Sequence, residues 1–173
     1  MNIAKWLIEV TIGVVIGIIA AFILFNYVFF TAVVVSGSME PTVMTGAYTL
    51  SNRLSYTFDD PERGDVAFFY SIDEPDTVFL KRVIGLPGDH VVVKGGSVYI
   101  NGMKLDEPYL VTVMGTVRDG EWDVPEGMYF MMGDNRNDSA DSRVWQHPFV
   151  YREDFIAKAM VGYDTDNGMR MIE

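Results

Sequence analysis

The chain has 173 residues, of which 49% are hydrophobic and 21% are charged, a composition that suits one folded domain with an appendage. Its formal net charge of −11 leaves no excess of lysine or arginine to replace the counterions of phosphates, so we expect no nucleic acid partner. The absence of cysteine excludes disulfides, thiolate metal sites and a cysteine nucleophile.

The N-terminal segment is the most apolar part of the chain. Residues 10–35 carry no charge, and this run exceeds both the roughly 20 residues of a membrane-spanning helix and the about 7–15 apolar residues of a cleavable signal peptide. We therefore expect an uncleaved transmembrane anchor. Lys5 precedes the span and Arg53 is the next cation after it, which favours a cytoplasmic N-terminus. Residues 1–35 would form the cytoplasmic end and anchor, and residues 36–173 an extracytoplasmic β-rich domain.

Two serines separated by one glycine follow the apolar run, in the sequence VVVSGSMEPT at residues 33–42. As an isolated motif, Ser36-Gly37-Ser38 is typical of a flexible linker leaving a membrane helix. Whether the hydroxyl groups have a chemical role depends on what the rest of the chain provides.

The remainder of the chain predicts a β domain. Short β-branched and aromatic runs bounded by Gly, Pro, Asp and Asn cover residues 64–72, 77–86, 89–102 and 127–134. Turn chemistry predicts a hairpin at Gly95 and Gly96 and a second tight turn at Asn101 and Gly102. Two other segments are less regular: we expect a meander with loops over residues 106–125 and a short helical turn within residues 152–159.

Histidine and metal chemistry are poorly supported. His90 and His147 stand in turn-like contexts, and no serine has the surroundings of a nucleophile elbow, which disfavours a Ser-His-Asp triad. The acidic sequence GDNRNDSADSR at residues 133–143 looks like a calcium loop, but Arg136 occupies the third position, where an oxygen ligand is required. We expect neither a metal nor a cofactor.

Lysine is scarce, and Lys81 alone lies within an apolar strand-like run. One interpretation is an edge-strand residue whose ammonium group points to solvent. The other is chemical, because burial among apolar groups lowers the pKa of a lysine from about 10.4 and makes the neutral amine a usable general base. A serine hydroxyl needs such a base, and Ser-Lys pairs are an established variant of the catalytic triad.

Four motifs in order after the apolar run resemble the conserved boxes of bacterial type I signal peptidases, in their compact single-span form. They are SGSMEPT, RGDVAFF, KRVIGLPGD and GDNRNDSADSR, and together the resemblance covers nearly the whole chain. It implies a mostly β fold, with an antiparallel β-sheet catalytic domain and one N-terminal transmembrane helix. It also implies a membrane-bound serine endopeptidase that removes signal peptides from secreted preproteins after small residues, at A-x-A-like sites.

The resemblance carries roles for individual residues. Ser38 matches the nucleophile and Lys81 its general base. The hydroxyl of Ser36 and the backbone N–H of Ser38 match the oxyanion hole. Ser139 matches the serine that hydrogen-bonds the lysine amine and orients it.

Six further residues match supporting or substrate-binding positions. Two ion pairs are implied as structural supports, Arg82 with Asp134 and Asp141 with Arg143. Val34 and Leu80 match the wall of the pocket for small substrate residues.

The same resemblance implies partners and a location. The substrates would be signal peptides of secreted preproteins, bound by strand addition beside an exposed apolar face near the lipid bilayer, with transient contact to the secretion translocase. The protein would lie in the cell membrane with its catalytic domain outside. Two alternatives stay open: another membrane-anchored Ser-Lys processing peptidase, and an anchored β domain that only binds partners, in which Ser38 and Lys81 would be incidental.

Overall fold

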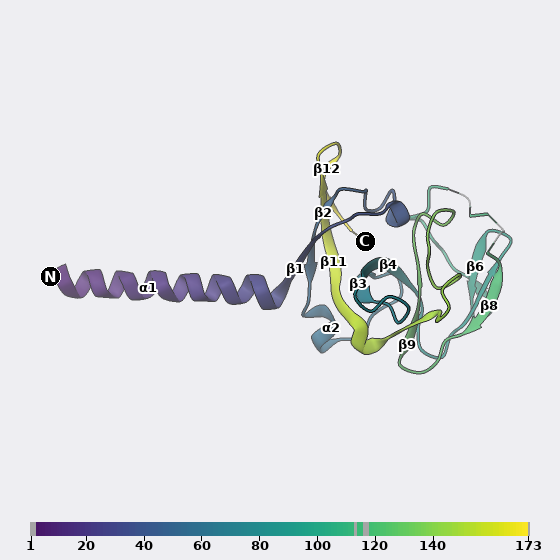
Figure 1. Cartoon of the computed structure of the whole chain (residues 1–173), viewed down its shortest axis with the longest axis horizontal. Helices are drawn as coiled ribbons and strands as arrows, with labels where there is room; N and C mark the ends of the chain where they lie inside the picture. Colours follow the sequence, from purple (N-terminus) through teal and green to yellow (C-terminus); the bar gives the residue numbers. More distant parts are fainter. Residues whose placement is uncertain (1–2, 113, 116–117, 173) are drawn as a thin grey trace.

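The computed structural model describes residues 3–112, 114–115 and 118–172, and shows an N-terminal helix that stands away from a β-rich unit (Figure 1). Helix α1 covers Ile3–Ile23, and one π-helical turn, η1, continues it over Leu24–Val28. None of these residues is buried. The combined segment Ile3–Val28 is long and apolar enough to cross a membrane.

The helix ends earlier than the uncharged run that predicted it. Strand β1 covers Phe29–Val33 and pairs with strand β2, Tyr48–Asn52, in antiparallel register. Helix and sheet therefore meet at Val28, and not after residue 35 as the sequence led us to expect. The reason is that an aromatic and β-branched strand without charge adds to a hydropathy run in the same way as a membrane helix does.

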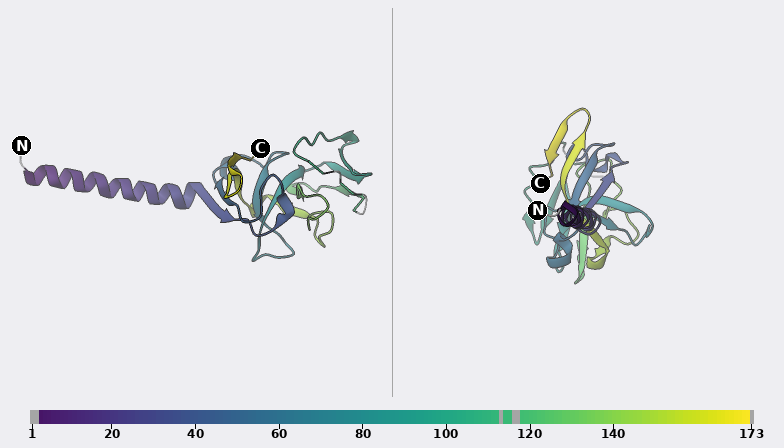
Figure 2. Two further views of the ribbon diagram at one scale, coloured as in Figure 1. Left: turned by 90° about the horizontal axis from the view of Figure 1, so that it is seen from above. Right: turned by 90° about the vertical axis from the view of Figure 1, so that its left-hand side faces the viewer.

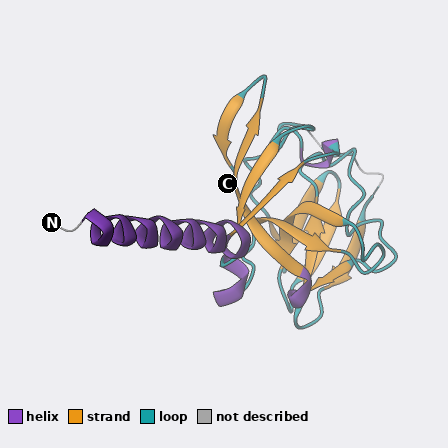
Figure 3. Ribbon diagram, turned by 60° about the vertical axis from the view of Figure 1, so that its left-hand side comes forward, coloured by secondary structure: helices purple, strands orange, loops and turns teal. Residues whose placement is uncertain are grey.

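Eight strands form one antiparallel sheet in the order β1-β2-β11-β3-β4-β9-β10, with β12 paired to β11. The strands not yet defined are β3 (Val66–Tyr70), β4 (Val78–Gly85), β9 (Met128–Met132), β10 (Phe149–Tyr151), β11 (Phe155–Asp164) and β12 (Gly168–Met171). Figure 3 shows that this sheet curls around the β unit and is not flat. The predicted mostly β fold class is confirmed.

A second sheet of four strands has the order β7-β6-β5-β8. It contains β5 (His90–Lys94), β6 (Ser97–Ile100), β7 (Met103–Lys104) and β8 (Gly120–Asp123). Three short helical turns complete the described chain: η2 (Gly37–Met39), α2 (Ser55–Phe58) and η3 (Arg152–Asp154).

The strand and turn predictions made from local sequence are confirmed. Each of the four β-rich runs contains at least one strand, and residues 106–125 hold β8 together with loops in their described part. Gly95 and Gly96 both have positive φ, 58° and 76°, as a primed hairpin turn requires. The second turn has the same character, with φ of 51° at Asn101 and 82° at Gly102.

The short helical turn expected within residues 152–159 is confirmed, and it is confined to the first three residues of that range. Only Arg152–Asp154 forms a helical turn, and strand β11 begins at Phe155. The side chains of Phe155, Ala157 and Ala159 are buried, while those between them are partly exposed, which is the period of a strand. Pairing with β2 and β3 therefore decides the conformation, against the helix propensity of the two alanines.

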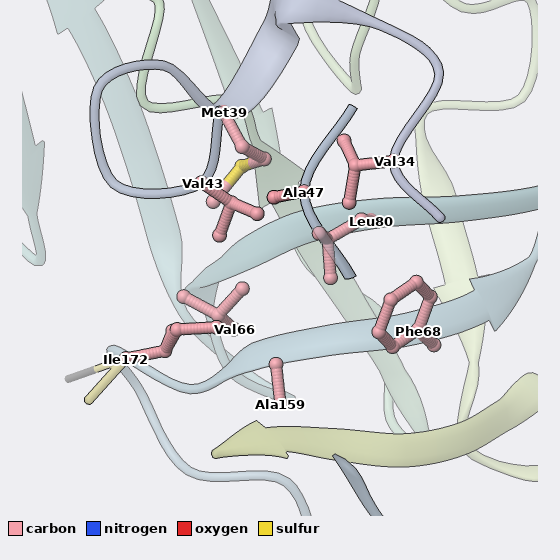
Figure 4. Close-up of a cluster of buried hydrophobic side chains, with 9 residues drawn as sticks. All are labelled: Val34, Met39, Val43, Ala47, Val66, Phe68, Leu80, Ala159 and Ile172. Atoms are coloured by element: carbon pink, nitrogen blue, oxygen red, sulfur yellow. The ribbon is translucent and has the colours of Figure 1, made fainter. Parts of the chain in front are cut away.

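One hydrophobic cluster includes Met39, the residue that follows Ser38 in the turn η2 (Figure 4). It joins Met39 and Val43 from that turn region to side chains of β3, β4 and β11, and includes Ile172 near the C-terminus. Met39 is fully buried. The side chain of Met39 therefore holds the turn against the sheet. Figure 2 shows that the helix continues into the β unit through β1.

Candidate active site

The first element of the site is the 3₁₀ turn η2, which places Ser38 between the buried Met39 and the more open Gly37. Glu40 N–H donates to Gly37 O at 3.1 Å and closes the turn. The Glu40 carboxylate in turn accepts hydrogen bonds from the backbone N–H and the hydroxyl of Thr45. Ser38 is thus a buried hydroxyl on a fixed turn, so the interpretation of this stretch as a flexible linker is wrong.

The second element is strand β4, which carries Lys81. This strand lies between β3 and β9, and Lys81 pairs with Ala67 of β3. Only 3% of Lys81 is exposed, so the interpretation as an edge-strand lysine pointing to solvent is wrong. Its Nζ lies 2.5 Å from Ser38 Oγ, within hydrogen-bond distance.

Burial lowers the pKa of Lys81 to about 8, and the negative charges of Asp141 and Asp134 oppose this shift. About a tenth of the amine is then neutral at pH 7, compared with roughly one lysine in several thousand at an ordinary pKa. The charged amine donates to Ser38 Oγ, whereas the neutral amine offers a lone pair to the serine hydroxyl. The arrangement can therefore activate Ser38 as a nucleophile.

Ser36 precedes the turn in extended conformation, with φ of −132° and ψ of 150°. Its side chain is exposed, and its Oγ lies 3.4 Å from Ser38 Oγ. The backbone N–H of Ser38 stands in the first turn of η2, where a helix offers no intrahelical acceptor. The hydroxyl and this N–H can therefore both donate to an oxygen bound next to Ser38 Oγ.

Ser139 does not make the contact expected of it. Its Oγ is buried and forms no hydrogen bond with any described residue, Lys81 included. It nevertheless lies close to Gly133, where an added Cβ would come within 2.3 Å of Ser139 Oγ. Ser139 is in the site, and its role in orienting the lysine stays a prediction.

The ion pair between Arg82 and Asp134 lies next to Lys81 and is almost fully buried. Arg82 donates Nε to Oδ1 at 2.9 Å and Nη2 to Oδ2 at 2.7 Å, and Thr42 adds a hydroxyl hydrogen bond to Oδ2 at 2.5 Å. The guanidinium also lies 3.9 Å from the centre of the Tyr109 ring. The Asp134 carboxylate, which follows β9, thereby connects to Arg82 of β4 and to Thr42 in the segment after Ser38.

A second buried pair joins Asp141 and Arg143, with Nε to Oδ1 at 2.8 Å and Nη2 to Oδ2 at 2.7 Å. Gly133 N–H also donates to Asp141 Oδ2, at 3.0 Å. Burial raises the pKa of Asp141, but the hydrogen bonds and charge of Arg143 outweigh this and hold it below its ordinary value. The carboxylate is therefore charged and fixes the backbone of Gly133.

Two residues of the site were not singled out from the sequence. Asn135 donates its backbone N–H to Ser38 O at 3.0 Å and its side-chain amide to Gly37 O at 3.1 Å. A Cβ at Gly133 would lie 2.4 Å from Ser38 O, so only glycine allows this approach. Both stand in the motif that supplied Asp134, but no local pattern links them to a turn almost a hundred residues earlier in the chain.

A groove of about 460 Å³ extends from Lys81 and Ser36 along β1 and the start of β4. Val34 and Leu80, the predicted pocket residues, both line it and belong to the same buried cluster (Figure 4). Within the described ranges, no three acidic or histidine side chains gather closely enough to hold a metal ion. The site thus brings the Lys81 amine, the Ser38 hydroxyl and the Ser36 hydroxyl together beside an apolar groove.

Comparisons with known proteins identify the family of the chain. A family model described as signal peptidase, peptidase S26, matches residues 6–163. A probable signal peptidase I-2 of Synechocystis is 41% identical over 133 residues, covering 74% of this chain and 60% of the relative. Signal peptidase I S of Bacillus subtilis is 35% identical over 149 residues, covering 80% and 79%. The chain spans only 56% of the length of signal peptidase I from Pseudomonas aeruginosa.

A solved structure is also similar. The crystal structure of a signal peptidase I from Enterococcus faecalis superposes with a TM-score of 0.51 at 33% identity, covering 58% of this chain and 97% of that one.

Proposed function

The chain belongs to the peptidase S26 family of bacterial type I signal peptidases, and on that premise we propose that it removes signal peptides from exported preproteins with a Ser38–Lys81 dyad. The observation that carries the proposal is the 2.5 Å distance between Lys81 Nζ and Ser38 Oγ, both buried and on fixed elements. The lowered pKa of Lys81 supports it, because a base must be neutral before it can accept a proton.

In the first half of the reaction, Ser38 Oγ attacks the carbonyl carbon of the scissile peptide while its proton passes to neutral Lys81. The carbonyl oxygen becomes an oxyanion and accepts hydrogen bonds from Ser38 N–H and Ser36 Oγ. As the C–N bond breaks, Lys81 gives its proton to the leaving amine. This leaves the signal peptide as an ester on Ser38 and releases the mature protein with a free N-terminus.

In the second half, Lys81 accepts a proton from a water molecule that attacks the ester. Collapse of this intermediate returns the proton to Ser38 Oγ and releases the signal peptide with a free carboxylate. Asp134 and Asp141, whose charges raise the pKa of Lys81, are each paired with an arginine, Arg82 and Arg143.

The groove supports cleavage after small residues. Val34 and Leu80 are both buried, and they form part of the groove wall beside the dyad. We propose that alanine-sized side chains at the −1 and −3 positions fit against this wall. A larger side chain there would have to displace buried core residues, and packed cores resist such changes.

The location we propose is the cell membrane, with the N-terminus in the cytoplasm and the β unit outside. The apolar helix supports an anchor, and the sheet supports contact with lipid. Val33, Tyr48, Tyr163 and Met169 pair across β1, β2, β11 and β12, so their side chains share one face. All four are exposed, and their strands lie on the side of the β unit from which the helix leaves (Figure 1). The substrate would contact both this exposed face of the sheet and the translocase.

The test uses the full chain in detergent and a peptide with an Ala-x-Ala site. Ser38→Ala and Lys81→Ala should each abolish cleavage, and the double variant should be no slower than either single variant, because nucleophile and base act as one unit. Lys94→Ala is the matched control, since Lys94 is exposed and lies in β5 outside the site.

Each outcome selects a different activity. Additive losses, or an active Lys81→Ala variant with a folded β unit, would refute the dyad. A folded wild-type protein that binds the peptide without cleaving it would favour a binding domain. Cleavage only at sites lacking small residues would favour another Ser-Lys processing peptidase.

A further inference from the structure

We infer that Glu74 makes the groove select a basic residue upstream of the cleavage site, four to seven residues before the scissile bond. This inference rests on the proposed function, because it assumes that the groove binds the signal-peptide side of the substrate. The groove is otherwise apolar along most of its length. Of the described residues that line it, only Lys81 and Glu74 carry charge, and Lys81 belongs to the dyad.

The direction of the groove places Glu74 at the end away from the chemistry. β1 leads to Ser36 and Ser38, and β4 leads from Val78 to Lys81, so both strands approach the dyad from the same end. Glu74 precedes β4 and lines the opposite end. Val34 and Leu80, the proposed wall for the −1 and −3 side chains, lie between Glu74 and the dyad, so the substrate residues near Glu74 are those further upstream.

The geometry of an extended chain gives the position. Val78 lies three residues before Lys81 in β4, which is about 10 Å along a strand. A substrate in extended conformation alongside β4 advances by the same length per residue, so its fourth residue before the cleaved bond lies level with Val78. Glu74 lies beyond that level, and the reach of its side chain covers positions −4 to −7.

The segment that carries Glu74 is held in place by its neighbours. Asp73 accepts hydrogen bonds from the backbone N–H groups of Gln146 and His147, and its Oδ1 lies 2.6 Å from His147 Nδ1. Thr77 N–H donates to Glu74 O at 3.0 Å. The Asp73 carboxylate therefore holds the segment in place. The Glu74 carboxylate is exposed and has no ion pair or hydrogen bond among the described residues. A lysine or arginine in the substrate can supply that partner.

The experiment measures kcat/KM for peptides that share one Ala-x-Ala site and differ only at one upstream position, scanned from −4 to −7 with Lys, Gln or Glu. Exposed ion pairs give small effects, so we expect a preference of about 2- to 5-fold for Lys over Gln at one of these positions, and a larger one over Glu. The preference should shrink in high salt. Glu74→Gln should bring the three rates together, and Glu74→Lys should reverse their order.

Asp76→Asn is the matched control, because Asp76 is an exposed carboxylate of the same segment that does not line the groove. It should keep both the activity and the preference of the wild type. The inference is overturned if no position shows a preference, if Glu74→Gln keeps it, or if Asp76→Asn loses it equally.

Failure of the proposed function would be seen separately. Binding of the same peptides to the Ser38→Ala variant measures the preference without cleavage. If this binding shows the preference but the wild type cleaves no peptide, the proposed dyad is refuted and the Glu74 contact is supported. If the wild type cleaves the peptides, Ser38→Ala does not, and no preference for a basic residue is seen, only the Glu74 contact is refuted.

Discussion

Gly133→Ala should lower the activity of the protein by about 10²-fold while leaving it folded. The substitution adds a Cβ that would lie 2.4 Å from Ser38 O and 2.3 Å from Ser139 Oγ. Ordinary contacts of a Cβ begin near 3.4 Å, so the backbone at Ser38 must shift by about 1 Å relative to Gly133. The φ of Gly133 is not in the left-handed region, so lack of space is the problem and backbone strain is not.

A backbone shift of this size should lower the rate of cleavage, because the position of Ser38 Oγ is set by the position of the Ser38 backbone. A misplacement of about 1 Å can cost about 10²-fold in rate, so we expect kcat/KM to fall by about that factor. The added atom also overpacks a buried region, which costs about 1–3 kcal/mol of the free energy of unfolding. Peptide cleavage and thermal unfolding, measured on the same preparation, separate the two effects.

Two other glycines provide matched controls for this substitution. At Gly85, a Cβ would lie 2.7 Å from Val91 Cγ2 and 2.9 Å from Phe130 Cβ, so Gly85→Ala should lose stability and keep the kcat/KM of its folded fraction. At Gly162, the nearest atom, Ile172 Cδ1, is at 3.6 Å, so Gly162→Ala should change neither. Full activity of Gly133→Ala, or equal loss in Gly85→Ala, would refute the argument that Gly133 positions Ser38.

Two further predictions concern the base and its support. Since the neutral amine is the active form, kcat/KM should rise as the pH passes the lowered pKa of Lys81, about 8, and level off above it. Changing His90 and His147 together to glutamine should leave this rise in place, whereas a loss of about 10²–10⁴-fold would assign the base to a histidine. Arg82→Met should cost about 3–5 kcal/mol in urea unfolding, because it leaves Asp134 buried without its charged partner, and a cost under about 1 kcal/mol would contradict that role.

The sequence predicted those parts of the fold that local chemistry decides. The hairpin at Gly95 and Gly96 follows from two adjacent residues that tolerate positive φ, and the runs around it are short and β-branched. Strand β11 could not be predicted in the same way, because Ala157 and Ala159 favour a helix in isolation. Their strand conformation depends on β2 and β3, which lie far away in sequence.

The candidate site also has parts that local sequence predicts and parts that it does not. Ser38 and Lys81 were recognisable because each stands in a motif that resembles a known box, and a buried lysine in an apolar run is unusual by itself. The contacts that fix them were not recognisable from local pattern. Asn135 reaches Gly37 and Ser38 only through the folded sheet, and the hydrogen bond expected from Ser139 to Lys81 is absent although both side chains lie in the site.

The arrangement around Lys81 joins two requirements that oppose each other. The amine must be buried to lower its pKa, and burial between β3 and β9 provides this. The same position brings it near Asp134 and Asp141, whose charges raise its pKa. Both carboxylates are needed as hydrogen-bond acceptors, Asp134 for the Thr42 hydroxyl and Asp141 for the backbone N–H of Gly133. Each carboxylate is paired with an arginine, and a paired charge acts on its surroundings more weakly than a lone one. The two arginines therefore do more than stabilise the fold, since without them the charges nearest the base would favour the protonated amine, which cannot accept a proton from Ser38.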